Sequence, residues 1–257
     1  MRIEMRGIDK SFGSNQVLKQ AGFTLESGEV HALMGENGAG KSTMFNAICG
    51  DFLTDSGSVV LDGEDITFLP QHARAKNIGR LYQDPMRGTA PGMTILENLA
   101  LAAGQGGWLS RISKSDKQRF REQLALLDIG LEDRMNHPVG LLSGGQRQAL
   151  TLLMATMNPP KLLLLDEPFS ALDYQTRLNV CDDVYRIIKS EKKTAVLITH
   201  DISEAVSVAD EAIVLSRRPA TLVAEYALPF GEETPLKRRE NPAFSLWFER
   251  LWKDLNV

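Results

Sequence analysis

The sequence predicts an α/β fold in which a parallel sheet is covered by helices. Residues 161–216 alternate short apolar segments with longer helix-forming ones, and strands that are apolar on both faces occur in sheets buried on both sides. A compact apolar segment at 30–35 also ends in a glycine-rich turn that leads into a helix-forming segment at 41–50. Between about 87 and 158 the pattern is helical, which indicates a helical subdomain inserted in the middle of the chain.

The expected elements follow in order, beginning with the N-terminal third. Residues 1–34 read as short strands joined by turns, and the last of these strands is 30–35. A helix is expected over 41–50. Residues 56–66 resemble a turn, a strand and a second turn, with Asp62-Gly63 as a hairpin signal.

The central third carries apolar residues at helical spacing. We expect helices in "TILENLALAA" (94–103) and in "DKQRFREQLALLDIGL" (116–131), joined by a polar connection over 104–116.

Strands and helices alternate in the last third. The expected elements are a strand at 161–167, a helix near 173–190, a strand at 194–200, a helix near 202–208 and a strand at 211–216.

Composition restricts the class of protein. The 257 residues are 43% hydrophobic and 24% charged, which is typical of a globular protein of one large or two small domains. The 29 basic and 33 acidic residues give a net charge of −4, so we expect no nucleic-acid partner. Cys49 and Cys181 form no disulfide or metal-binding pattern. We expect no signal peptide and no membrane-spanning helix, and hence a protein that works from the cytoplasm.

The first glycine-rich turn has the spacing of a phosphate-binding loop. Residues 35–42 fit G-x-x-x-x-G-K-[ST] at every fixed position, between an expected strand and an expected helix. In such a loop, backbone N–H groups and the helix N-terminus surround phosphates. Lys41 would reach the β- and γ-phosphates, and the Ser42 hydroxyl would bind Mg²⁺. The nucleotide contacts expected here are Gly35, Glu36, Asn37, Gly38, Ala39, Gly40, Lys41, Ser42 and Thr43.

Two carboxylates follow the four-leucine strand "LLLLDE". Open α/β sheets place their ligands at the ends of strands, where Asp166 would help to hold Mg²⁺. Glu167 would act on an attacking water as a general base, although an acidic residue here also suits a solvated loop. Together with the phosphate loop, the two carboxylates predict hydrolysis of ATP or GTP.

A second glycine-rich helix start occurs at Ser143-Gly144-Gly145-Gln146. It offers another anion-binding helix N-terminus with a serine cap. A tight turn packed on the core would account for the two glycines, but not for their coincidence with a hydroxyl, a helix start and Gln146. One domain has only one phosphate site to fill. A second phosphate-binding start would therefore meet a nucleotide held by another copy, which makes two composite sites in a two-fold dimer.

At residues 142–146, "LSGGQ", the sequence resembles the signature motif of the ATP-binding-cassette (ABC) family. The other family motifs follow in order over nearly the whole chain: the P-loop at 35–42, "LYQDP", "LLLLDE", "SALD" at 170–173 and "LITHD". The resemblance implies a P-loop NTPase core with an antiparallel β subdomain and an inserted helical subdomain. It also implies ATP held between the P-loop of one subunit and the signature motif of the other.

The resemblance implies roles for further residues. Gln83 would bind Mg²⁺ and signal to a transport subunit, His200 would contact the γ-phosphate, and Asp173 would link the two sites across the dimer. Phe12 matches the aromatic residue that stacks on adenine, although a plain core phenylalanine is the alternative. The implied catalytic residues are Glu167, His200, Lys41 and Gln83. The implied Mg²⁺ ligands are Ser42, Gln83 and Asp166, and the implied contacts to the partner's ATP are Ser143, Gly144, Gly145 and Gln146.

The chain is similar to the separate ATPase subunit of an ABC transporter, and it resembles the subunits of importers more than those of exporters. This implies an ATP-dependent homodimer on the cytoplasmic face of the membrane, with permease subunits and an extracytoplasmic solute-binding protein as partners. Residues 62–102 and 140–167 resemble ATPases of tryptophan/tyrosine-type importers, whereas 167–177, 199–206 and 215–220 resemble those of nitrate, sulfonate and taurine importers. The expected solute is thus an amino acid or a small anion.

The expected domains are an ABC ATPase domain at 1–225 and a C-terminal extension at 226–257. The extension carries an apolar helical stripe that we expect to pack on its own domain: Phe244, Trp247, Phe248, Leu251, Trp252 and Leu255. The alternative function is an ABC ATPase that acts on ribosomes or DNA. Three features argue against it: the single cassette, the absence of long arms or a cysteine cluster, and the slightly negative net charge. A GTPase would need an N-K-x-D motif, and the sequence has none.

Overall fold

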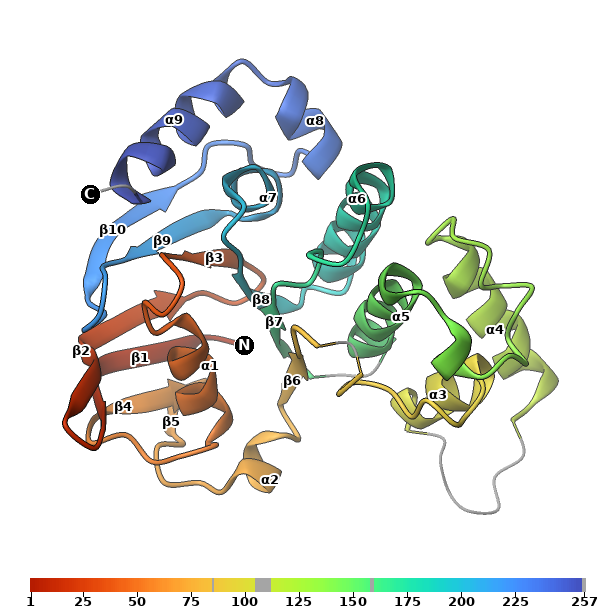
Figure 1. Cartoon of the computed structure of the whole chain (residues 1–257), viewed down its shortest axis with the longest axis horizontal. Helices are drawn as coiled ribbons and strands as arrows, with labels where there is room; N and C mark the ends of the chain where they lie inside the picture. The colour runs from red at the N-terminus through yellow and green to blue at the C-terminus, as the bar shows by residue number, and fades with distance from the viewer. Residues whose placement is uncertain (85, 105–111, 158–159, 256–257) are drawn as a thin grey trace.

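A six-stranded sheet forms the core of the computed structural model, which describes residues 1–84, 86–104, 112–157 and 160–255. The strand order is β10-β9-β3-β8-β7-β6, and every pair except the edge pair of β10 and β9 is parallel. The α/β prediction is therefore confirmed (Figure 1). The strands are β3 (Val30–Met34), β6 (Ile78–Leu81), β7 (Leu162–Asp166), β8 (Thr194–Ile198), β9 (Glu211–Leu215) and β10 (Leu222–Ala227).

An antiparallel sheet of order β2-β1-β4-β5 lies beside this core (Figure 1). Its strands are β1 (Ile3–Phe12), β2 (Asn15–Leu25), β4 (Ser56–Leu61) and β5 (Glu64–Asp65). The expectation of short strands before residue 34 is wrong, because β1 and β2 span 10 and 11 residues. Register shifts within this pair interrupt the alternation of apolar and polar positions, so that each long strand reads as shorter pieces. The expected hairpin is present, with Asp62 and Gly63 both at positive φ between β4 and β5.

Helix α1 (Lys41–Cys49) lies between the two sheets (Figure 1). One buried cluster joins Ile8 of the antiparallel sheet, Phe45 of the helix and Leu164 of the parallel sheet. This packing fixes the start of α1 relative to the ends of the parallel strands.

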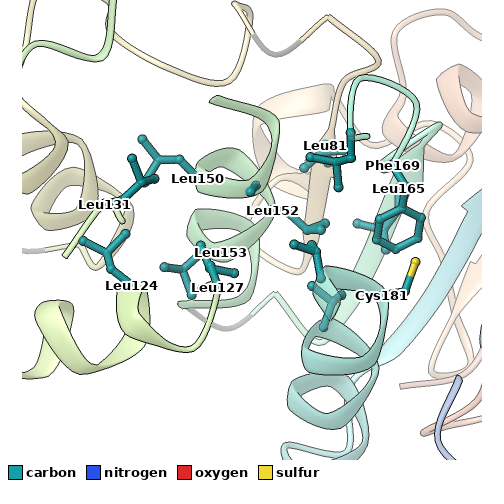
Figure 2. Close-up of a cluster of buried hydrophobic side chains, with 14 of the residues drawn as sticks. Leu81, Leu124, Leu127, Leu131, Leu150, Leu152, Leu153, Leu165, Phe169 and Cys181 are labelled. Carbon is teal, nitrogen blue, oxygen red and sulfur yellow. The ribbon is translucent and has the colours of Figure 1, made fainter. Parts of the chain in front are cut away.

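On the opposite face, helix α5 (Gly144–Met157) is buried on two sides (Figure 2). Leu150 and Leu153 point toward the segment that carries Leu124 and Leu131, whereas Leu152 points toward the sheet. The helices of this face are α3 (Ile95–Ala102), α4 (Lys114–Ala125), the 3₁₀ turn η1 (Val139–Leu141) and α6 (Tyr174–Ser190).

Two helices of this region start at side-chain caps. In α3, Thr94 and Glu97 form a reciprocal capping box. In α4, the Ser113 hydroxyl accepts a hydrogen bond from the Asp116 N–H at 3.0 Å, so residues 114–116 are helical rather than part of the expected polar connection. Most of that connection, 105–111, lies outside the described residues.

The C-terminal extension packs on the edge of the sheet (Figure 1). Leu251 is fully buried, and Phe244, Trp247, Phe248 and Leu255 are partly buried against the same cluster, whereas Trp252 remains 57% exposed. The helices here are α7 (Ile202–Val208), α8 (Pro235–Glu240) and α9 (Ala243–Leu255). Elsewhere, a short helix α2 (Gln71–Arg74) precedes β6. Among the residues in the structure's described ranges, no helix is long and apolar enough to cross a membrane.

Candidate functional site

The glycine-rich loop at 35–42 connects the end of β3 to the start of α1. Gly38 (φ 81°) and Gly40 (φ 111°) lie in the left-handed region. A Cβ on Gly40 would stand 3.0 Å from Leu18 Cδ2 and 3.2 Å from Ala220 Cβ, so only glycine fits there. The loop therefore has the tight backbone that cradles phosphates at a helix N-terminus.

Lys41, the first residue of α1, lies folded back on this loop. Its Nζ donates to the Gly35 carbonyl at 2.7 Å and to the Glu36 carbonyl at 2.9 Å. The residue is 6% exposed, and burial lowers its pKa. The ammonium group is thus held beside the loop, where an incoming phosphate would replace carbonyl partners with charged oxygens.

A cavity of about 420 Å³ adjoins the loop and gathers most of the predicted site. Its lining residues are Asn37, Gly38, Gly40, Lys41, Ser42, Thr43, Gln83, Asp166, Glu167, Ile198 and Arg218. Asp166 ends β7 and is 8% exposed, and burial raises the pKa of its carboxyl group. The hydroxyl of Ser42, the amide of Gln83 and the carboxylate of Asp166 are the oxygen donors that Mg²⁺ prefers, so the donor set fits this ion.

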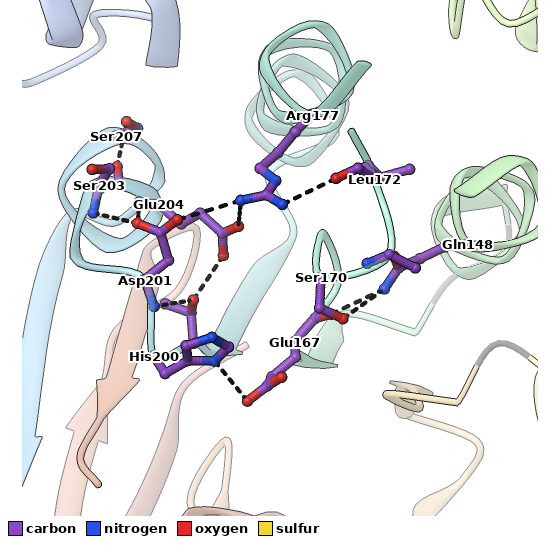
Figure 3. A network of polar contacts seen from close by, with 12 residues as sticks. Gln148, Glu167, Ser170, Leu172, Arg177, His200, Asp201, Ser203, Glu204 and Ser207 are labelled. Carbon is purple, nitrogen blue, oxygen red and sulfur yellow. Dashed lines mark hydrogen bonds and ion pairs between the residues drawn. The ribbon is translucent and has the colours of Figure 1, made fainter. Parts of the chain in front are cut away.

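Three segments of the chain meet at Glu167, and Figure 3 shows two of them, those that carry Glu167 and His200. Gln83 Nε2 donates to Glu167 Oε2 at 3.0 Å, and His200 Nδ1 lies 3.0 Å from Glu167 Oε1. Glu167 follows β7 with φ 45°, and its N–H donates to the Ile198 carbonyl at the end of β8. The structure therefore brings together Gln83, Glu167 and His200, although 84 residues separate Gln83 from Glu167 and 33 separate Glu167 from His200.

The signature residues lie outside this cavity. Gly144 opens α5, and the Gln146 N–H donates to the Ser143 hydroxyl at 3.2 Å while Gln146 Oε1 accepts from the Ser143 N–H at 3.3 Å. Ser143 and Gly144 are exposed. Asp173 is also exposed and caps α6, and its hydrogen bond from the Thr176 N–H lowers its pKa. None of these residues lines the phosphate cavity of its own chain.

Two polar contacts that the sequence analysis missed connect these parts (Figure 3). Gln148 of α5 is fully buried, with Nε2 donating to the Glu167 carbonyl at 3.0 Å and Oε1 accepting from the Ala171 N–H at 2.6 Å. The signature helix is thereby tied to the backbone of Glu167. The only available sequence signal was a polar residue on an otherwise apolar helix face.

Arg177 makes the second contact, between α6 and the loop that carries His200 (Figure 3). Its Nη2 donates to the Leu172 carbonyl at 3.0 Å, and its Nη1 lies 3.4 Å from Asp201 Oδ2 and 3.6 Å from Glu204 Oε1. The segment before Asp173 is therefore held to the start of α7.

The remaining predicted residues lie at the margins of the site. Gly35, Glu36 and Asn37 line a second cavity of about 390 Å³ together with His200, Ile202, Trp252 and Leu255. Ala39 is buried within the loop. Phe12, at the end of β1, is 51% exposed and contacts the Phe52 ring edge-on, with 5.4 Å between centroids. An exposed ring face of this kind suits stacking on a base.

Comparison with known sequences agrees with this geometry. Residues 18–170 match the family described as ABC transporter. The chain is 33% identical over 227 residues to a tyrosine transport ATP-binding protein of Clostridioides difficile, covering 86% of this chain and 90% of that one. It is 40% identical over 218 residues to a sulfate/thiosulfate import ATP-binding protein of Methylococcus capsulatus, covering 84% and 61%.

Solved structures share the fold. A dimeric structure of MJ0796, a bacterial ABC transporter cassette, has a TM-score of 0.76 at 28% identity, covering 88% of this chain and 98% of that one. A dimeric post-hydrolysis state of the ATP-binding cassette MJ0796, bound to ADP and Pi, has a TM-score of 0.74 at 26% identity, with the same coverage.

Proposed function

Because this chain belongs to the ABC transporter family as one of its ATPase subunits, we propose that it dimerises around two ATP molecules and drives solute import through a membrane permease. One observation carries the proposal. The P-loop cavity contains the lysine and carboxylates of a nucleotide site, whereas Ser143 and Gly144 are exposed outside it. The signature motif is therefore free to meet ATP held by a second copy.

Within one site, the roles follow from the contacts. Lys41 and the loop backbone hold the phosphates, and Phe12 stacks on adenine. Mg²⁺, held by Ser42, Gln83 and Asp166, would neutralise charge on the β- and γ-phosphates. Glu167 accepts the proton of the attacking water, and His200 contacts the γ-phosphate.

Closure adds the partner's residues. Ser143, Gly144, Gly145 and Gln146 cover the partner's ATP, and Asp173 connects the two sites. In the structure of the single chain, Gln83 and His200 each contact one oxygen of Glu167, so nucleotide binding would exchange these contacts for Mg²⁺ and phosphate.

A substitution of Ser143 by Arg tests the composite site. The bulky cation should exclude the partner's ATP and its signature contact, so that turnover falls by at least about 100-fold, the loss typical of removing electrostatic stabilisation from an active site. Binding of ATP to the monomer should remain within about two-fold, because Ser143 does not line its own cavity. Phosphate release and isothermal titration calorimetry measure the two effects.

Ser115→Arg, on exposed α4, is the matched control and should keep full turnover. Loss of monomer binding in Ser143→Arg would contradict the assignment of the signature motif to the partner's site.

We propose that the permease contacts the surface between α2 and α5, around Arg80 and Tyr82. Two cavities of about 220 and 200 Å³ share Arg80 and Tyr82, and the Arg80 guanidinium lies 4.6 Å from the centroid of the Tyr82 ring. This surface adjoins Gln83, which lines the nucleotide cavity. A permease helix bound there would therefore respond to changes at the nucleotide. The sequence predicts that the permease meets the surface near Gln83 and the helical segment around 87–110, and residues 105–110 of that segment lie outside the described residues.

Affinity purification of the tagged chain from mildly detergent-treated membranes tests this partner. A polytopic permease should co-purify near stoichiometrically, and a solute-binding protein with it would support import. Tyr82→Ala should reduce permease recovery several-fold without affecting ATP binding, whereas Leu246→Ala, which changes an exposed apolar side chain on α9, should not. Ribosomal or DNA-repair proteins in place of a permease would contradict the proposal.

The solute that we propose is an amino acid or a small anion. The relatives described above bear the names of tyrosine and sulfate/thiosulfate transport. A further relative, the spermidine/putrescine import ATP-binding protein of Haemophilus influenzae, is 35% identical over 257 residues, and this chain covers 63% of its length. We further propose an ATPase domain at 1–225, with a helical subdomain at about 87–158, and an extension at 226–257.

A further inference from the structure

The loop after β9, residues 216–221, packs against the P-loop although it is about 180 residues away in sequence. The Ala220 N–H donates to the Val17 carbonyl at 2.8 Å, which fixes the end of the loop to β2. Arg217 makes a two-pronged ion pair with Glu36, with Nε–Oε2 and Nη2–Oε1 distances of 2.9 and 2.7 Å. The loop therefore holds a defined position beside the nucleotide site.

Arg218, the next residue, is placed differently from Arg217. Its Nε donates to the Gly38 carbonyl at 3.2 Å, and its Nη2 lies 3.8 Å from where a Cβ on Gly38 would stand. The side chain lines the 420 Å³ cavity together with Lys41 and Ser42. Among the residues whose placement is described, no carboxylate pairs with Arg218, and its two terminal nitrogens have no hydrogen-bond partner.

An unpaired guanidinium at this position is suited to a phosphate. Arginine presents parallel N–H donors that match two oxygens of one phosphate group, and such charge-assisted contacts are strong. The cavity's other cation, Lys41, stands opposite the carboxylates of Asp166 and Glu167. A second cation at the rim would therefore raise the positive potential where the polyphosphate enters.

We propose that Arg218 is a nucleotide-binding residue of its own chain. Its Nε is anchored on the Gly38 carbonyl, and its Nη1 and Nη2 donate to the phosphate chain of the ATP in the P-loop. Arg217 has a separate task, since its charge is already matched by Glu36 and it positions the loop. The inference rests on the proposed assignment of this cavity to the phosphates of ATP.

Calorimetric titration of the full chain with MgATP and with MgADP tests the proposal. Arg218→Ala should weaken ATP binding by about 10-fold, as expected for one charge-assisted contact, and the loss should shrink in high salt. Arg218→Lys, which keeps the charge, should recover binding to within about three-fold of wild type. Arg121→Ala, which removes an exposed arginine of α4 that pairs with Asp133, is the matched control and should change the affinity by no more than about two-fold. Arg217→Ala should weaken binding less than Arg218→Ala does, because the charge of Arg217 is already matched by Glu36.

The outcomes separate this inference from the function on which it rests. If the wild-type chain fails to bind MgATP, both the proposed function and the role of Arg218 are contradicted. Wild-type binding with an unchanged Kd in Arg218→Ala would overturn the role of Arg218 alone. An unchanged Kd together with loss of ATP-dependent dimerisation would assign Arg218 to the partner's site and would also overturn the proposal. Equal losses in Arg217→Ala and Arg218→Ala, with a lowered melting temperature, would indicate a structural loop instead.

Discussion

Replacing Glu167 by Gln is expected to lower ATP turnover by about 10³-fold while MgATP binding persists. An amide of the same shape keeps the space filled and the hydrogen bonds available, but it cannot accept a proton from water. Proton transfer by a positioned side chain contributes about 10²- to 10⁴-fold to catalysis. Phosphate release under saturating ATP measures the loss.

The second readout of Glu167→Gln is the oligomeric state. Since closure no longer ends in hydrolysis, a dimer with trapped ATP should accumulate and appear in light scattering. Glu26→Gln is the matched control, because Glu26 pairs with Arg2 on the surface and lines none of the cavities described at the nucleotide site. If turnover in Glu167→Gln stays within ten-fold of wild type, the role of Glu167 as general base is contradicted and the solvated loop residue is the correct interpretation.

Lys41→Ala is expected to weaken ATP binding by at least about 100-fold. The ammonium group is buried beside the loop, where its contact with a phosphate is less screened by water than at the surface. Charge-assisted hydrogen bonds contribute about 1.5–3 kcal/mol each, and Lys41 can make more than one. Titration with a fluorescent ATP analogue measures the affinity.

Lys41→Ala also removes two hydrogen bonds to loop carbonyls, so its folding must be tested separately. A melting temperature close to that of wild type would assign the loss to the phosphate contact. Lys237→Ala, on the exposed surface of α8, controls for net charge and should bind normally. Micromolar affinity retained in Lys41→Ala would contradict the assigned role.

Local pattern was sufficient to predict the central strands and the helices between them. The segments of β3, β7, β8 and β9 are apolar on both faces because helices or the second sheet cover both sides of the core. The strand β10 was not predicted, because it is an edge strand whose side chains are all exposed or half-buried and whose apolar run is only three residues long, Leu222–Ala224.

The residue types of the site were also readable from the sequence, because phosphate, Mg²⁺ and water activation each require specific donors at specific spacings. Those motifs identified Lys41 at the start of a helix and Asp166 and Glu167 at the end of a strand. Their spacing could not show that Gln83 and His200 both contact Glu167, since each contact joins separate strands of the sheet.

The sequence by itself therefore determined the family, the α/β fold and the chemistry of the P-loop, all of which depend on short-range order. Only the tertiary structure decided which distant side chains reach that loop. Because β9 pairs with β3, the loop after β9 lies beside the loop after β3, and Arg218 contacts Gly38. Because α5 packs on the sheet, Gln148 reaches the backbone of Glu167. Strand order and helix packing create these contacts, and no local pattern in the sequence encodes them.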